Sequence, residues 1–194
     1  MPDQNYHRED LKTELIQKGL LIFSKEGYEG LSLRKVAKAC GVSQTAPYRH
    51  FKDKDELITA ITIHAMRLFD LSLQQAARRP GDPGEQLREM GVAYVHFFVA
   101  NPKYLKLLFF SKIKEYIKKD GCGGEGHPFS TLINAVKRYK EWAVNETRSV
   151  EELTLYCWGL VHGISVLISS GHMPHAGNHL SLAESVIRGE KFLV

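Results

Sequence analysis

The sequence has few of the features that mark secreted proteins. It contains only three cysteines, Cys40, Cys122 and Cys157, and because they are odd in number and widely scattered, a secreted type of disulfide framework is not expected. The N-terminal residues MPDQNYHREDLK are polar where a signal peptide would need an apolar segment. We therefore expect a cytoplasmic protein.

Patterns for catalysis and for metal or cofactor binding are also missing. The chain has no Gly-x-Ser-x-Gly motif and no phosphate-binding loop. His172, His175 and His179 are interrupted by a proline and a glycine, which prevents them from sharing one regular helix, and Cys122 with His127 does not complete a set of four ligands. The sequence predicts no catalytic residue, no metal site and no cofactor.

Helical periodicity dominates what is present. Apolar residues recur at spacings of three and four, and no sustained run alternates with period two, so an all-α fold is predicted. With 194 residues, 43% of them hydrophobic and 25% charged, the chain has the composition of an ordinary globular protein. Helices are expected at about 10–25, 32–40, from 43 onward, 53–78, 87–100, 102–110, 129–147, 149–170 and 180–192.

Residues 32–51, SLRKVAKACGVSQTAPYRHF, predict two short helices that meet at a tight turn. Ala37 is small enough for the helices to approach, Gly41 can adopt a positive φ, and Val42 is an apolar residue at the turn. Six basic and two acidic residues lie between 29 and 54, so this window carries a charge of +4, equal to that of the whole chain. A basic helix-turn-helix suits DNA, although a charge cluster alone is often only a solvated surface.

The run GYEGLSLRKVAKACGVSQTAPYRHFKDKDEL resembles the DNA-binding domain of the TetR family of transcriptional regulators. Farther along, Trp158, His162 and Gly163 in CWGLVHGIS resemble the Trp-His-Gly signature of one C-terminal subgroup of these regulators. The resemblance implies a helix-turn-helix domain over residues 1–54 and a helical domain for effector binding and dimerisation over residues 55–194.

Transferred residue by residue, the resemblance gives Tyr48 and His50 contacts to the phosphate backbone and makes Gln44 and Thr45 base readers. Glutamine can pair with adenine, and threonine can contact a thymine methyl group. Tyr48 could instead pack against the first helix, His50 could be a partly buried imidazole, and Arg34 could reach either a guanine or a phosphate. The predicted DNA-binding residues are Arg34, Ser43, Gln44, Thr45, Tyr48, His50 and Lys54.

Pro47 departs from the family pattern, because many relatives carry a larger aliphatic residue there. Proline has no amide hydrogen and crowds the carbonyl group four residues earlier. We therefore expect the start of the recognition helix to be distorted.

Residues 153–170 contain no Asp, Glu, Lys or Arg, and form a helix of roughly 27 Å, which is at the lower limit for a membrane span. Polar residues within the segment favour a helix buried in the protein instead. Two glycines four residues apart would let another helix come close, and TetR-like proteins dimerise through their last helices; the alternative is that the glycines pack within one chain. The predicted dimer residues are Gly159, Gly163, Leu180, Ala183 and Ile187.

Aromatic residues are dense in the middle of the chain, and most of them are expected in the core. The resemblance implies an effector cavity among these helices, and an aromatic lining would suit a small, largely apolar ligand. The predicted lining residues are Tyr94, Phe97, Phe98, Phe109, Trp142, Trp158 and His162, with His162 as a polar anchor.

The resulting hypothesis is a ligand-responsive repressor that binds a palindromic operator in double-stranded DNA as a homodimer. Two alternatives stay open: an all-α small-molecule-binding protein, or an all-α enzyme, each without a role at DNA.

Overall fold

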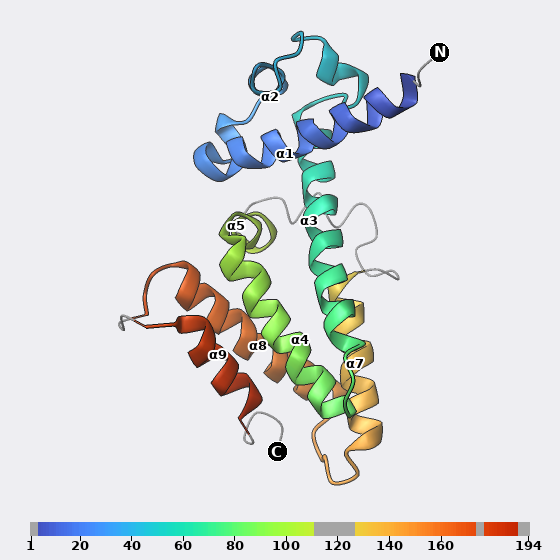
Figure 1. Cartoon of the computed structure of the whole chain (residues 1–194), viewed down its shortest axis with the longest axis vertical. Helices are drawn as coiled ribbons and strands as arrows, with labels where there is room; N and C mark the ends of the chain where they lie inside the picture. Colours follow the sequence, from blue (N-terminus) through green and yellow to red (C-terminus); the bar gives the residue numbers. More distant parts are fainter. Residues whose placement is uncertain (1–3, 111–126, 174–176, 190–194) are drawn as a thin grey trace. The chain divides into compact units, whose positions relative to one another are not determined.

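Figure 1 shows the computed structural model of the chain, which describes residues 4–110, 127–173 and 177–189. No strand occurs among these residues, and the predicted all-α fold class is confirmed. The elements are α1 (Gln4–Gly30), α2 (Leu33–Ala39), the 3-10 helix η1 (Ala46–Arg49), α3 (Lys54–Ala77), α4 (Pro83–Ala100), α5 (Pro102–Phe110), α7 (Pro128–Trp142), α8 (Val150–Ser169) and α9 (His179–Arg188). They belong to two compact units, Met1–Ala65 with Lys106–Asp120 and Met66–Leu105 with Gly121–Val194.

In the first unit, α1, α2 and η1 precede the beginning of α3. The Ser32 hydroxyl caps α2 by accepting a hydrogen bond from the amide of Lys35 at 3.2 Å. Gly41 follows α2 with a φ of 69°, and the amide of Val42 donates to the carbonyl of Ala37 at 3.1 Å. The predicted turn of the helix-turn-helix is therefore confirmed.

The expected α-helix from Ser43 onward is wrong, because the structure has the short 3-10 helix Ala46–Arg49 there. An α-helix would need the amide of residue 47 to donate to the carbonyl of Ser43, and Pro47 has no amide hydrogen. The amide of Ala46 donates to that carbonyl instead, at 3.0 Å, and the amide of Tyr48 donates to the carbonyl of Thr45 at 3.2 Å. Pro47 thus explains the tighter geometry, and the predicted distortion is confirmed.

The second unit is organised around α4, which packs against α7, α8 and α9 (Figure 1). Capping boxes begin two of its helices: Asp82 with Glu85 at α4, and Ser149 with Glu152 at α8. The inward face of α4 supplies large buried side chains, including Met90, Tyr94 and Phe98.

Among the described helices, α8 is the one long and apolar enough to cross a membrane by length and composition, with a mean hydropathy of 1.3. Its buried residues Leu153, Cys157, Val161 and Ser165 lie on the side that packs within the unit. Only 28% of the apolar window is buried, so the expectation of a helix buried on most sides is corrected: burial explains one face of the uncharged segment, and Leu155 and Leu167 lie on its exposed surface.

Candidate functional site

The helix-turn-helix presents several predicted DNA-binding residues to solvent. Arg34, Ser43, Gln44 and Thr45 are exposed, and Tyr48 is 52% exposed, which argues against the alternative that Tyr48 packs against the first helix. His50 and Lys54 are half-buried. The hydroxyl groups of Ser43 and Thr45 lie 3.2 Å apart and share a hydrogen bond.

Neighbouring side chains hold Lys54 at the first turn of α3. Its Nζ lies 3.8 Å from the centre of the Tyr28 ring and donates a hydrogen bond to the Tyr28 carbonyl oxygen at 3.3 Å. The Tyr28 hydroxyl in turn donates to Asp55 Oδ1 at 2.6 Å. Stacking a cation on an aromatic face restricts its position while leaving its charge intact.

One exposed cation on η1, Arg49, was not among the residues predicted from the sequence. Within η1, Pro47 is buried, Ala46 is half-buried, and Tyr48 and Arg49 are exposed. The sequence did contain a signal for Arg49, because it is a basic residue directly after the predicted phosphate contact Tyr48.

In the second unit, three of the predicted effector residues form a hydrogen-bonded group. Trp158 Nε1 donates to the Tyr94 hydroxyl oxygen at 3.2 Å, and that hydroxyl lies 2.9 Å from His162 Nδ1. Because the tryptophan can only donate, the Tyr94 oxygen is the acceptor of that bond, while the direction of the bond between Tyr94 and His162 depends on the histidine tautomer. Burial raises the pKa of Tyr94 above its ordinary value, against the opposing effect of the Trp158 hydrogen bond, so this hydroxyl stays protonated.

An aromatic cluster surrounds this group. The ring centres of Tyr94, Phe97 and Phe98 lie 5.1, 5.2 and 4.7 Å from that of Phe69, which was not predicted from the sequence. The ring centre of Trp158 lies 5.0 Å from that of Phe129, another residue not anticipated.

Two predicted effector residues lie elsewhere. Phe109 is in the part of α5 that belongs to the first unit. Trp142 is 51% exposed at the end of α7, and its ring neighbour is Tyr139, with 6.2 Å between centres. Tyr94, Phe97, Phe98, Trp158 and His162 are therefore the predicted residues that the second unit brings together.

A buried polar group beside these rings was also not predicted from the sequence. Asp70 on α3 is 4% exposed, and its oxygens accept hydrogen bonds from the Thr131 hydroxyl at 2.5 Å and from Gln74 Nε2 at 2.7 Å. Burial lowers the pKa of nearby His127, with the charge of Asp70 opposing that shift. The signal in the sequence was an acidic residue directly between the apolar residues Phe69 and Leu71.

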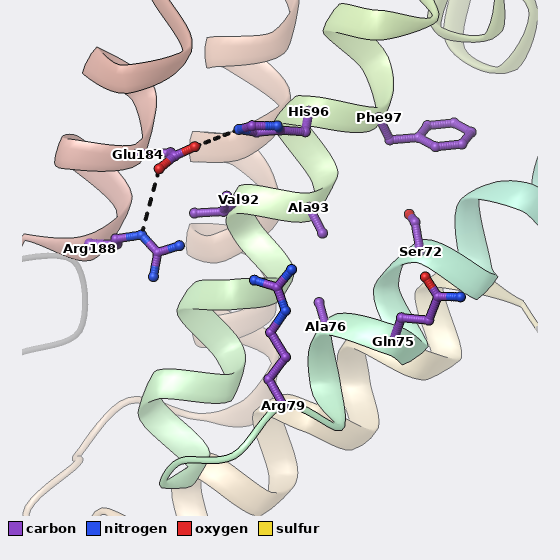
Figure 2. A pocket seen from close by; sticks show the side chains of 10 residues that line it. All are labelled: Ser72, Gln75, Ala76, Arg79, Val92, Ala93, His96, Phe97, Glu184 and Arg188. Atoms are coloured by element: carbon purple, nitrogen blue, oxygen red, sulfur yellow. Dashed lines mark hydrogen bonds and ion pairs between the residues drawn. The ribbon is translucent and has the colours of Figure 1, made fainter.

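An open groove of about 460 Å³ lies between α3, α4 and α9, and Figure 2 shows the side chains that line it. Arg79 and Arg188 each contact one oxygen of Glu89, and His96 Nε2 lies 2.7 Å from Glu184 Oε1. Partial burial would raise the pKa of Glu89, but hydrogen bonds from the two arginines and their charges hold it below its ordinary value. Phe97 is the one predicted effector residue that lines this groove, and its ring points away from Glu184 (Figure 2).

The predicted dimer residues divide into two groups. Ala183 and Ile187, at 4% and 0% exposure, are buried within the unit, where α9 packs against α4, and Leu180 is half-buried; the expectation that this side of α9 faces a partner is therefore corrected. A Cβ atom added to Gly159 or Gly163 would meet nothing within 4 Å, so packing within the chain does not explain these glycines.

Exposed apolar side chains lie on α8 and α9 instead, at Leu155, Leu167, Leu182 and Val186. The histidine and cysteine sets considered as metal ligands include Cys122 and His175, which lie outside the described residues. Within the described part of the chain, no group of three or more His, Cys, Asp or Glu residues is placed to hold a metal ion.

A helix-turn-helix in one unit and an all-α second unit that follows it define the architecture of a transcriptional regulator. Comparison of the sequence with known families matches residues 15–61 to "Bacterial regulatory proteins, tetR family" and residues 87–189 to "Tetracyclin repressor-like, C-terminal domain". The chain belongs to the TetR family of bacterial transcriptional regulators.

Individual relatives agree with this assignment. The HTH-type transcriptional regulator AcrR of Shigella flexneri is 36% identical over 83 residues, which are 42% of this chain and 39% of that regulator, so the match spans less than half of either protein. The TetR family regulator PfmR of Thermus thermophilus has a similar fold, with a TM-score of 0.70, 21% identity and coverage of 92% of this chain and 93% of PfmR. The fatty acid degradation regulator FadR of Bacillus halodurans gives a TM-score of 0.73 at 17% identity, covering 94% of both chains.

Proposed function

We propose that this protein is a cytoplasmic, ligand-responsive repressor without catalytic activity, which binds DNA through residues 1–54 and an effector through residues 55–194. The observation that carries the proposal is the exposed η1 turn, with Tyr48 at its surface and Lys54 held nearby on α3. The hydrogen bonds that join Tyr94 to Trp158 and His162 support membership of the Trp-His-Gly subgroup, because they give two of its signature residues a shared structural role.

Dimerisation would give the repressor two recognition turns for the two halves of an operator, about 34 Å apart along DNA. The apolar surface of α8 and α9 supports a two-fold contact there, since Leu155 is 76% exposed and Gly159 and Gly163 leave space for a close helix. The effector would act by favouring a subunit arrangement in which the two turns no longer match successive major grooves.

Binding to fluorescently labelled DNA from upstream of the protein's own gene tests the proposal, with unrelated DNA of equal length as the control. The wild type is expected to prefer the upstream DNA, and Tyr48→Ala to weaken binding of the dimer by about a hundredfold, because it removes from each subunit a phosphate contact of about one to two kcal/mol. Equal, sequence-independent binding by both proteins would remove the DNA assignment and favour the alternative of an all-α ligand-binding protein or enzyme.

Light scattering tests the dimer separately. The wild type is expected to have the mass of two chains, and Leu155→Glu that of one, because a carboxylate would be buried at the contact. The matched control, Val144→Glu, changes a side chain that is 93% exposed outside α8 and α9 and should remain a dimer. A monomeric wild type at micromolar concentration would contradict the proposed contact.

A further inference from the structure

Lys12 on α1 is a charged residue on the face of the helix that otherwise turns inward. Leu15, Gly19 and Phe23 follow it at spacings of three, four and four, and all three are buried. Lys12 shares this face by its spacing, yet it is exposed. Within the described part of the chain, its ammonium group forms no salt bridge with a carboxylate.

The contact that Lys12 does make places it beside the predicted DNA-binding surface. Its Nζ lies 6.0 Å from the centre of the Phe51 ring, which is 2% exposed. Phe51 directly follows His50, and their ring centres are 6.3 Å apart. The two distances together, about 12 Å, are the largest possible separation of Lys12 Nζ from the centre of the His50 ring. The N-terminal half of α1 and the end of η1 therefore lie side by side (Figure 1).

The acidic residues Asp10 and Glu14 lie on other sides of α1. They stand two positions before and after Lys12, and two residues turn an α-helix by about 200°. Glu14 lies near Cys40 instead: burial raises the pKa of this thiol, and the charge of Glu14 adds to the shift. Neither carboxylate shares the side of α1 on which Lys12 approaches Phe51, so the ammonium charge is available to an anion from outside the chain.

The backbone of DNA fits this arrangement. One strand of a duplex has a phosphate for every 3.4 Å along its axis, so about 12 Å spans three to four phosphates. Lys12 can therefore reach the same stretch of backbone as His50. Its ammonium group is at the outer limit of a cation–π contact, so the stem can pack on Phe51 while the charge stays in solvent.

We propose that Lys12 binds a DNA phosphate, which makes α1 a part of the DNA-binding surface. The inference rests on the proposed repressor function and adds a helix on which no DNA contact was predicted. Because a phosphate contact reads no base, Lys12 adds affinity for DNA of any sequence and leaves the base preference unchanged.

Replacing Lys12 by methionine tests the proposal, because methionine keeps an apolar stem against Phe51 and removes the charge. Binding of the full chain to the labelled upstream DNA and to the unrelated DNA is titrated over a range of salt concentrations. Each neutralised phosphate contributes about 0.9 to the salt slope, so losing one from each subunit should lower the slope of the dimer by about 1.8. The ratio of the affinities for the two DNAs should stay within about twofold of the wild-type ratio.

Matched variants separate the charge from the packing. Lys12→Arg keeps the positive charge and should keep the wild-type slope. Lys137→Met removes an exposed lysine from α7 in the second unit and should keep it too. Circular dichroism and thermal unfolding check that each variant folds. Should Lys12→Met not fold, Lys12→Gln provides a second uncharged variant with the same expected loss of slope.

Parallel slopes for the wild type and the folded uncharged variant would overturn the inference, as would an equal loss of slope in Lys137→Met. If parallel slopes accompany a preference of the wild type for the upstream DNA, the Lys12 contact is removed and the repressor function stands. If the wild type binds both DNAs equally, the repressor function is removed, and the slopes still decide whether Lys12 contacts DNA. Absence of any DNA binding would overturn both.

Discussion

Replacing Lys54 by glutamine should reduce the salt dependence of DNA binding. The structure fixes the ammonium group over the Tyr28 ring, 3.8 Å from its centre, at the first turn of α3. A lysine held in this way can neutralise a phosphate without losing much freedom on binding. Glutamine can still donate a hydrogen bond but releases no counterion.

The size of the effect follows from the number of phosphates that are no longer neutralised. The logarithm of the association constant falls with the logarithm of salt concentration by ~0.9 per phosphate neutralised, so removing one such phosphate from each subunit lowers the slope of a dimer by about 1.8. Between about 50 and 200 mM salt, the advantage of the wild type over Lys54→Gln should therefore shrink by roughly 12-fold.

Fluorescence anisotropy at four or more salt concentrations measures this slope. Lys54→Arg serves as the matched control, because it keeps the charge and the stacking on Tyr28 and should keep the wild-type slope. The glutamine variant loses about 0.5 to 1 kcal/mol of cation–π stabilisation, so the first unit should remain folded at room temperature. Parallel slopes for the wild type and Lys54→Gln would refute the assignment of Lys54 to a phosphate.

Three further outcomes are expected. Phe98→Ala should lower the free energy of unfolding in urea by about 3 to 5 kcal/mol, because the ring is 0% exposed and its removal leaves a cavity; a loss below about 1 kcal/mol would mean that the core closes around the gap. The Arg148 hydrogen bond lowers the pKa of Glu146 to about 2 from an ordinary 4.5. The ionised Glu146 therefore stabilises the folded protein above pH 4.5, and this contribution is lost as the pH falls toward 2. Between pH 6 and pH 3.5, the free energy of unfolding in urea should fall less for Glu146→Gln than for the wild type. Pro47→Leu supplies an amide hydrogen toward the Ser43 carbonyl and should convert η1 toward an α-helical turn. Selection of bound oligonucleotides should then show a changed base preference. An unchanged preference would exclude the geometry of η1 as a determinant of base preference.

Local signals in the sequence predicted local structure well. Ser32 and Ser149 were expected at helix starts and both cap their helices, because a hydroxyl that accepts from an amide three residues later needs only neighbouring residues. Gly41 was expected at the turn and has the positive φ that the turn requires. The missing amide hydrogen of Pro47 likewise correctly predicted that the start of the recognition helix is distorted.

Contacts between distant residues could not be predicted in the same way. Helical spacing groups Leu180, Ala183 and Ile187 on one side of α9, but it does not say whether that side faces α4 or a second chain, and two of these residues are buried within the unit. Aromatic composition likewise did not distinguish Trp158, which joins Tyr94, from Trp142, which is half-exposed at a helix end.

The open space beside Gly159 and Gly163 has a consequence for directed evolution. A helix with an interior glycine is about 1 kcal/mol less stable than the same helix with alanine. At both positions an added methyl group would meet no atom of the chain within 4 Å. A laboratory screen for heat resistance alone is therefore expected to enrich alanine at both positions. An added methyl group would occupy the space that the proposed dimer contact needs, so many of the heat-resistant variants should no longer repress their gene.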